Sequence, residues 1–201
     1  MILKNFIVFE GIDGAGTSTQ LKLLSEKDSE NIYITAEPTE FETGIFLRKM
    51  LKGDFPLDSK TAAFLFAADR NEHLFGKGGI KEQTEKNKIV ACDRYIFSSL
   101  AYQSISCGEE LPKLLNSTFP LPEILFFFEI DPEISLKRVN SRNEKKEIYE
   151  KLETQKKIAI EYEKIISEYE NDASCEMKII RIDATKSIEE ISDTISKIIL
   201  P

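Results

Sequence analysis

A glycine-rich segment near the amino terminus constrains the fold of this chain more than any other feature. Residues 11–19 read Gly-Ile-Asp-Gly-Ala-Gly-Thr-Ser-Thr, so three glycines stand directly before three hydroxyl side chains. An apolar run ending at Glu10 precedes the segment, and leucines follow it at positions 21, 23 and 24. This order of buried strand, tight turn and helix predicts a βα unit. Its glycines let backbone N–H groups and the helix N-terminus point at one anion.

The spacing of the segment matches a phosphate-binding loop at all but one position. Such a loop has glycine, four residues, a second glycine, lysine, and then serine or threonine. Gly11, Gly16 and Ser18 fit this pattern, whereas Thr17 stands in place of the lysine. The backbone donors do not depend on that lysine, although a glycine-rich turn that binds nothing is the alternative. The candidate ATP-binding residues of the loop are Gly11, Ile12, Asp13, Gly14, Ala15, Gly16, Thr17, Ser18 and Thr19.

Apolar runs of strand length alternate with helical patterns along the whole chain. The expected strands are Asn5–Glu10, Ile32–Ala36, Lys88–Asp93, Ile124–Ile130 and Met177–Ile182. The expected helices are Thr17–Glu26, Thr43–Lys52, Ser59–Phe75, Phe97–Ile105, Pro132–Asn140, Lys146–Glu170 and Ser187–Leu200. This alternation predicts a three-layer α/β fold of the P-loop NTPase type, in which helices flank a five-stranded parallel sheet. With 201 residues and no visible linker, the chain is expected to form a single domain over residues 1–201.

The composition disfavours several classes of protein. Hydrophobic residues make up 41% of the chain, and no apolar stretch approaches the ~18 residues of a membrane span. The net charge of −8 disfavours a nucleic-acid partner. The chain starts with strand-like residues rather than a signal sequence, so a cytoplasmic location without a membrane partner is expected. Three scattered cysteines and the single His73 do not match a metal site. They indicate reduced thiols and a histidine that is packed or solvated on a helix.

Three acidic residues, Asp13, Glu37 and Asp93, lie at or just beyond the ends of expected strands. Ligands of parallel α/β sheets bind beyond the carboxyl ends of the strands, so these residues predict the ligand-binding edge. Asp93 can hold Mg²⁺ or its water shell together with the Ser18 hydroxyl, and these two residues are the expected metal ligands. The adjacent Arg94 can clamp phosphate oxygens with two parallel hydrogen bonds. A surface Asp–Arg pair that caps the next helix is the alternative.

Two further segments carry functional signals with a structural alternative. Phe66 and Arg70 are four residues apart on an otherwise apolar helix, so both project from one face. A flat ring and a charged donor suit a nucleobase, whereas Phe66 taken alone is more typical of a core residue. The charged run over residues 140–147 fits either a solvated connection or a lid over a phosphate site.

Taken together, these motifs resemble those of the thymidylate kinases, which convert dTMP to dTDP. The resemblance runs over nearly the whole chain and rests on the order and spacing of the motifs. They are Phe9-Glu-Gly-Ile-Asp-Gly-Ala-Gly16 with Ser18-Thr-Gln20, Glu37-Pro38, Leu47-Arg48, Phe66-Ala-Ala-Asp-Arg70, Asp93-Arg-Tyr95, Ser98, Ala101-Tyr-Gln103, Ile130-Asp-Pro132 and Ile182-Asp-Ala184. The resemblance implies in-line transfer of the γ-phosphoryl group of ATP to dTMP with Mg²⁺, and a homodimer.

The resemblance also implies individual roles. Phe66 would stack on thymine, Arg70 would hydrogen-bond the O4 atom, and Gln103 would hold the base edge. Tyr102 would favour deoxyribose over ribose. The implied dTMP-binding residues are Asp13, Glu37, Arg48, Phe66, Arg70, Arg94, Ser98, Tyr102 and Gln103.

A second set of implied roles concerns the phosphates. Arg48 and Arg94 would grip the acceptor phosphate, and Asp13 would orient it through Mg²⁺ and water. A segment over approximately residues 138–150 resembles the family's lid over ATP, and its Arg138 and Arg142 complete the implied ATP-binding set. The implied catalytic residues are Asp13, Arg94 and Arg142.

Two positions depart from the family pattern. Ala36 stands where many members carry an arginine, and Thr17 replaces the loop lysine. Lid cations, with Arg142 as the first candidate, can replace the lysine together with Arg94. Otherwise the enzyme is slow, or the chain binds nucleotides without catalysis. The intact dTMP positions favour replacement, while an inert regulatory module and a kinase for another deoxynucleotide or a deoxynucleoside are the alternative functions.

Overall fold

A parallel sheet forms the centre of the fold. The computed structural model describes residues 1–141, 148–149 and 151–200. Within them the strands are β1 (Ile2–Gly11), β2 (Ile32–Ala36), β3 (Ile89–Asp93), β4 (Leu121–Glu129) and β5 (Lys178–Asp183). Their order in the sheet is β2-β3-β1-β4-β5, and every neighbouring pair is parallel. The register places Ala36 and Phe9 on either side of Asp93, so the carboxyl ends of three strands meet at one edge.

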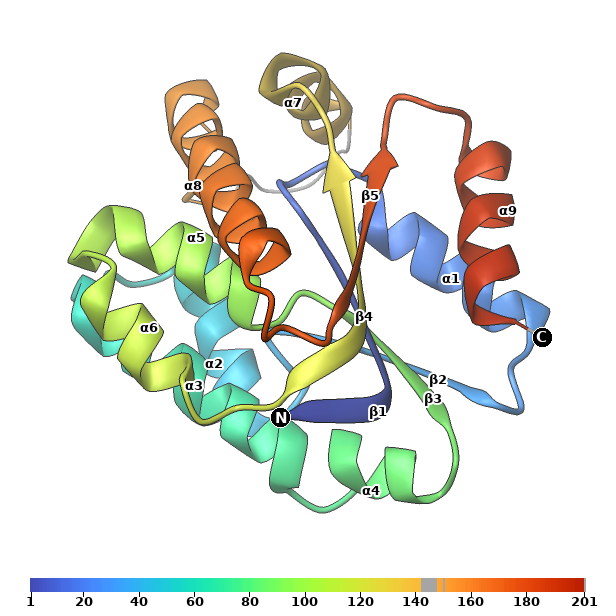
Figure 1. Cartoon of the computed structure of the whole chain (residues 1–201). Coiled ribbons are helices and arrows are strands. Elements are labelled where there is room, and N and C mark those ends of the chain that lie inside the picture. The colour runs from blue at the N-terminus through green and yellow to red at the C-terminus, as the bar shows by residue number, and fades with distance from the viewer. Residues whose placement is uncertain (142–147, 150, 201) are drawn as a thin grey trace.

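Helices cover both faces of this sheet, as Figure 1 shows. Helices α1 and α9 lie on one face, and α3, α5 and α8 lie on the other. The helices of the described residues are α1 (Thr17–Lys27), α2 (Glu42–Leu51), α3 (Ser59–Phe75), α4 (Ile80–Glu85), α5 (Ile96–Cys107), α6 (Glu110–Asn116), α7 (Pro132–Asn140), α8 (Leu152–Asn171) and α9 (Ile188–Ile199).

Successive residues of the central strands alternate between two cores. Phe6 and Val8 of β1 belong to the core that includes α5 and α8, whereas Ile7 and Phe9 belong to the core that includes α1 and α9. A strand buried on both faces has no solvent side, which explains why the sequence shows continuous apolar runs instead of a polar alternation. The expected α/β fold with a five-stranded parallel sheet is confirmed.

Local sequence signals set several helix ends. Asp131 accepts a hydrogen bond from the backbone N–H of Glu133, and Pro132 occupies the first turn of α7. At α9, Ser187 and Glu190 form a reciprocal capping box. These capped helices are among those whose bounds agree with the sequence expectation to within a residue.

Several parts of the fold differ from the expectation. The strand expected over Ile124–Ile130 is β4, which begins at Leu121 and ends at Glu129. The strand expected from Asn5 begins at Ile2, with a register shift against β4 between Leu3 and Ile7. Helices α4 and α6 were not expected, because six or seven residues are too few to show a helical period. A helix start at Lys146 is wrong, since Ile148 and Tyr149 lie in a turn and α8 begins at Leu152.

The backbone groups of that turn form hydrogen bonds outside α8. The N–H of Ile148 donates to the carbonyl of Leu51 at the end of α2 over 3.1 Å, and the Tyr149 carbonyl accepts from the N–H of Lys151 over 2.9 Å. The segment before α8 therefore contacts α2 instead of extending the helix. Across the described residues, no helix is both long and apolar enough to cross a membrane.

Candidate active site

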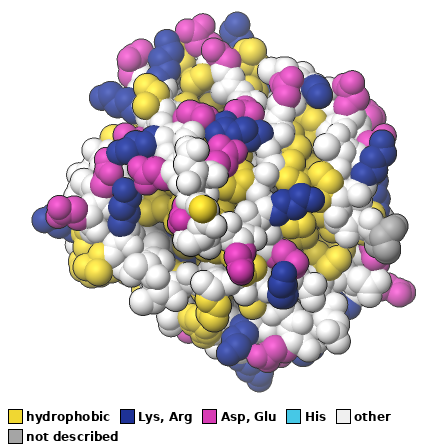
Figure 2. Space-filling view, in the orientation of Figure 1, with side chains coloured by type: hydrophobic (Ala, Val, Ile, Leu, Met, Phe, Trp, Pro, Cys, Tyr) yellow, Lys and Arg dark blue, Asp and Glu magenta, His cyan; other side chains and the backbone are white. Residues whose placement is uncertain are grey.

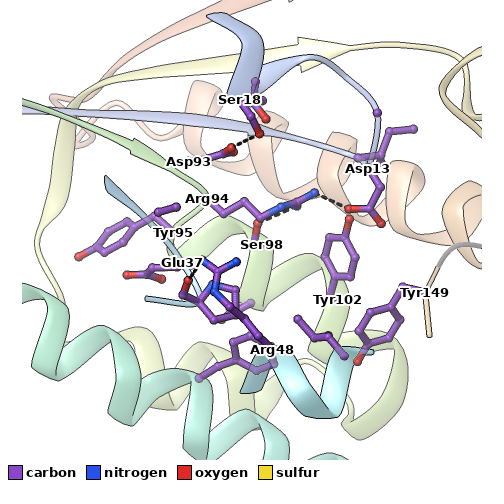
Figure 3. Close-up of a pocket in the computed structure, with 18 of the residues that line it drawn as sticks. Asp13, Ser18, Glu37, Arg48, Asp93, Arg94, Tyr95, Ser98, Tyr102 and Tyr149 are labelled. Atoms are coloured by element: carbon purple, nitrogen blue, oxygen red, sulfur yellow. Dashed lines mark hydrogen bonds and ion pairs between the residues drawn. The ribbon is translucent and has the colours of Figure 1, made fainter. Parts of the chain in front are cut away.

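A cavity of about 620 Å³ opens at the edge of the sheet where the sequence predicts ligand binding. It is lined by the glycine-rich loop on one side and by residues of α2, α3 and α5 on the other, and Figure 3 shows several of these side chains pointing toward one another. The expected site residues that line it are Ile12, Asp13, Gly14, Gly16, Thr17, Ser18, Thr19, Glu37, Arg48, Phe66, Arg70, Asp93, Arg94, Ser98, Tyr102 and Gln103. One cavity therefore brings the two sets of expected residues together.

The glycine-rich loop needs glycine for two separate reasons. Gly14 has a φ of 85°, and a Cβ atom there would lie 2.7 Å from the Ser135 carbonyl oxygen. Gly16 has a φ of 101° and forms the N-cap of α1, which begins at Thr17. The N–H groups at this helix end are the donors that an anion would meet. Gly11 and Ala15, also expected to bind ATP, lie behind the cavity lining and shape the loop.

Ser18 and Asp93, the expected metal ligands, are in direct contact. The Ser18 hydroxyl donates to Asp93 Oδ2 over 2.5 Å (Figure 3), while Asp93 Oδ1 is buried and has no hydrogen-bond partner within the described residues. A hydroxyl and a carboxylate oxygen are the hard ligands that Mg²⁺ prefers, and Mg²⁺ commonly takes its remaining ligands from water and phosphate. The unpartnered oxygen thus fits a magnesium site.

Arg94 is held in an unusual backbone conformation at the centre of the cavity. Its φ is 71°, which lies in the left-handed region that residues with a Cβ atom rarely adopt. Its guanidinium donates to Asp13 Oδ1 over 2.6 Å, to Ser98 Oγ over 3.2 Å and to the Tyr162 hydroxyl over 3.3 Å. Burial alone would lower the pKa of Arg94, but the surrounding tyrosines and carboxylates raise it, so the guanidinium stays charged.

Glu10 holds the turn that carries Arg94, a role that was not assigned from the sequence, although Glu10 belongs to the Phe9-Glu-Gly motif. Its side chain is fully buried at the end of β1. Oε1 accepts from the N–H groups of Tyr95 (2.7 Å) and Ser98 (3.1 Å), and Oε2 accepts from the hydroxyls of Ser98 (2.6 Å) and Tyr162 (2.8 Å). Burial raises the pKa of Glu10, although the charge of Arg94 and these hydrogen bonds oppose the shift. A charged residue inside an apolar strand was the only sequence signal for this role.

Arg70 is buried in a polar network below the cavity. Its Nη2 donates to Glu37 Oε2 over 2.6 Å and to Ser99 Oγ over 3.1 Å, and its Nη1 donates to Asn116 Oδ1. Glu37 also contacts His73 Nδ1 at 3.0 Å, so the single histidine is packed, one of the two expected alternatives. The Nε of Arg70 is buried without a partner within the described residues. Glu37 therefore orients Arg70, and one donor of Arg70 is left for a ligand.

Phe66, Tyr102 and Gln103 also line the cavity. The Tyr102 ring lies 5.2 Å from the Arg94 guanidinium and 5.2 Å from the Tyr149 ring. The Tyr102 hydroxyl and Gln103 Oε1 are both buried, and neither has a hydrogen-bond partner in the part of the chain that the structure describes. Buried polar atoms are nearly always paired, so these atoms are best explained by a ligand or ordered water that reaches them.

Comparison with known proteins identifies the family. The family model for thymidylate kinase matches residues 9–195. The chain belongs to the thymidylate kinase family. A "Putative thymidylate kinase" of Treponema pallidum (strain Nichols) is 42% identical over 196 residues, which cover 96% of this chain and 94% of the relative. A "Probable thymidylate kinase" of Methanocaldococcus jannaschii is 41% identical over 197 residues, which cover 97% and 95%.

A third relative has a name without a qualifier. The "Thymidylate kinase" of Leptospira borgpetersenii serovar Hardjo-bovis is 39% identical over 196 residues, which cover 92% of this chain and 88% of the relative. These matches confirm the resemblance found in the sequence, and they identify the chain as an enzyme of the kinase class.

Three further cations are expected from the thymidylate kinase pattern, and the structure describes two of them. Of these two, one lines the cavity. Arg48 lines it and donates to the carbonyls of Thr39, over 3.3 Å, and Pro38. Arg138 on α7 does not line it and donates to the Ala184 carbonyl over 3.0 Å. Arg142 lies outside the described residues, together with Lys145 and Lys146 of the expected lid.

Sequence reasoning missed several residues of the site. Asn116 and Tyr162 hold Arg70 and Arg94, while Lys52 and Tyr149 line the cavity. Gln155 donates from α8 to Asp13 Oδ2 over 2.7 Å. None of these five belongs to a local motif, and each comes from a segment far along the chain from its partner or from the loop.

Proposed function

We propose that this enzyme transfers the γ-phosphoryl group of ATP to dTMP, with Mg²⁺, and so forms dTDP. The names of the family and of its relatives support dTMP as the acceptor. The observation that carries the proposal is the single cavity shared by the glycine-rich loop and by Phe66, Arg70 and Gln103. A phosphoryl donor bound at the loop and a nucleotide bound at the other end would meet between them, which is the arrangement that direct transfer needs.

The unpartnered atoms at the acceptor end suit thymine. Thymine offers a carbonyl acceptor at O4 and a donor at N3–H. Arg70 Nε is a buried donor and Gln103 Oε1 a buried acceptor, so the pair complements these two positions. Cytosine reverses both positions and would leave the same atoms unpaired, at a cost that a buried site makes large. Both Phe66 and Tyr102 line the cavity, where Phe66 would stack on the base and Tyr102 would favour deoxyribose over ribose.

The acceptor is already an anion, so the transfer needs no strong base, and positioning with charge neutralisation provides the catalysis. Arg94 and Arg48 would bind the acceptor phosphate. Ser18 and Asp93 would hold Mg²⁺, which supplies positive charge to the donor phosphates when bound. Asp13, whose side chain is 23% exposed, would orient the acceptor through Mg²⁺ and water.

A coupled assay of ADP release tests this function. The enzyme with ATP and Mg²⁺ should release ADP rapidly with dTMP, more slowly with dUMP, and hardly at all with dCMP or thymidine. Binding of dTMP without ADP release would favour an inert regulatory module. Release with thymidine and none with dTMP would identify a deoxynucleoside kinase instead.

Thr17 leaves the donor phosphates without the usual lysine, and we propose that other cations replace it. Four cations of the described chain line the cavity, namely Arg48, Lys52, Arg70 and Arg94, and Arg142 stays the first candidate of the expected lid. Thr17→Lys should then change kcat by less than about tenfold, because a second cation adds little to a neutralised charge.

Arg142→Ala should lower turnover by orders of magnitude with nearly unchanged dTMP affinity, and adding Thr17→Lys should restore part of the loss. A gain of about 10³ from Thr17→Lys alone would mean that the charge is missing.

We also propose a homodimer, in which α3 of each copy takes part. Phe64 and Phe75 are 54% and 53% exposed, and they lie 11 residues apart on one side of α3. Sedimentation at micromolar concentration should give twice the 22.9 kDa of the chain, about 46 kDa, and a species near 23 kDa would contradict it. Basic and acidic side chains are interspersed on the face that Figure 2 shows, and the expected lack of a nucleic-acid partner stays a prediction. The cytoplasmic location and single domain stay predictions.

A further inference from the structure

The two carboxylate oxygens of Asp13 are bound by two different residues. Arg94 Nη2 donates to Oδ1 over 2.6 Å, and Gln155 Nε2 donates to Oδ2 over 2.7 Å. We propose that Gln155 is a positioning residue, which keeps Asp13 from forming a two-oxygen ion pair with Arg94 and so leaves Arg94 donors for the acceptor phosphate. The proposal rests on the proposed kinase function, because it concerns how Arg94 meets that phosphate.

The orientation of the Gln155 amide is determined by its neighbours. Its terminal nitrogen lies 2.7 Å from Asp13 Oδ2 and 3.1 Å from the Tyr149 carbonyl oxygen. Both neighbours only accept hydrogen bonds, so the atom that faces them must be the NH₂ group. The other atom, Oε1, is buried and has no partner within the described residues. The NH₂ group of Gln155 therefore faces Asp13 and donates a hydrogen bond to its carboxylate.

The position of Gln155 is fixed by its place in α8 and by burial. It lies in the first turn of α8, its backbone N–H donates to the Lys151 carbonyl over 2.9 Å, and its side chain is almost fully buried. The Ser135 hydroxyl donates separately to the backbone carbonyl of Asp13. The main chain of Asp13 is thus anchored by α7, and the loss of Gln155 would free its carboxylate but not its backbone. The Tyr149 carbonyl would lose one donor and keep the N–H of Lys151.

The chemistry of the amide suits this role. A carboxylate with both oxygens free tends to bind a guanidinium through two parallel hydrogen bonds. That arrangement would occupy two nitrogens of Arg94, whose Nη1 already donates to Ser98 and Tyr162. A neutral donor on Oδ2 prevents it without adding a positive charge that would compete with Arg94. Gln155 thereby sets how much of the Arg94 guanidinium faces the cavity.

The test uses Gln155→Met, which keeps the length of the side chain and removes the donor. In the parent enzyme this change should lower kcat/KM for dTMP by about tenfold, mainly through KM for dTMP, with KM for ATP nearly unchanged. In the Asp13→Asn background the same change should cost less than about twofold, because its partner is already altered.

Gln20→Met is the matched control. Gln20 is also a buried glutamine, it donates to the Ile188 carbonyl over 2.9 Å, and its Oε1 is likewise unpartnered within the described residues. It faces α9 outside the cavity, so its replacement should lower the melting temperature and leave KM for dTMP unchanged. An equal loss from Gln155→Met in both backgrounds, or no loss in the parent, overturns the role of Gln155. A parent enzyme without turnover of dTMP overturns the proposed function and this role with it.

Discussion

Arg94→Ala is expected to lower kcat/KM for dTMP by about 10³, the largest single effect in the site. Arg94 is a guanidinium in the centre of the cavity, and it is held there by Asp13, Ser98 and Tyr162. Removing it takes away both a charge on the transferring oxygens and the partner of Asp13. Arg94→Lys keeps the charge but loses the planar pair of donors, so an intermediate loss is expected. Steady-state kinetics with ATP and dTMP measures both.

The control for Arg94 is Arg181→Ala. Arg181 is also an ion-paired arginine, with Glu129, Glu163 and Glu170 within 2.9 Å, but it lies on β5 and does not line the cavity. Its replacement should lower the free energy of unfolding and leave kcat/KM close to that of the parent. If the two variants lost activity equally, the effect at Arg94 would reflect folding and not catalysis.

Asp93→Asn is expected to have the second largest effect, and to show it through Mg²⁺. The change keeps the shape of the side chain but removes the negative charge beside the Ser18 hydroxyl. The Mg²⁺ concentration that gives half-maximal activity should rise by about 10- to 100-fold, and kcat at saturating Mg²⁺ should fall by about 10². A titration of activity against Mg²⁺ at constant ionic strength measures both quantities.

Asp183→Asn provides the comparison for Asp93. Asp183 ends β5 at the same edge of the sheet, but it is exposed and accepts hydrogen bonds from Thr185. Its replacement should leave the Mg²⁺ titration unchanged. An unchanged titration for Asp93→Asn as well would rule out Asp93 as a metal ligand.

Much of the fold was predictable because each buried parallel strand is a short, continuous apolar run. The strand Ile32–Ala36 and the helices Ser59–Phe75 and Pro132–Asn140 have the expected bounds. The turn at Tyr149 was not predictable, because its charged residues fit a helix equally well and only its contact with α2 decides the outcome. The hydrophobic periodicity of the sequence indicates a local preference for a helix, whereas tertiary contacts decide where that helix begins.

The residues of the site were also predictable only in part. Residues in the loop, and residues such as Asp93 and Arg70, belong to motifs that can be recognised along the chain. The residues that hold them do not, since Tyr162 lies 152 positions from Glu10 and Gln155 lies 142 positions from Asp13. A single buried polar residue gives no signal of its partner when the partner is that far away. Which residues bind the substrates stays a prediction until the variants above are measured.

The contacts of α8 also bear on how the protein is made. A chain leaves the ribosome from its amino terminus, so the glycine-rich loop and the Asp93–Arg94 turn emerge long before residues 152–171. Until then Glu10 lacks the Tyr162 hydroxyl and Asp13 lacks the Gln155 amide. The nascent chain thus presents the loop early but completes the acceptor end late. The contacts of Glu10 and Asp13 are therefore complete only after α8 has emerged.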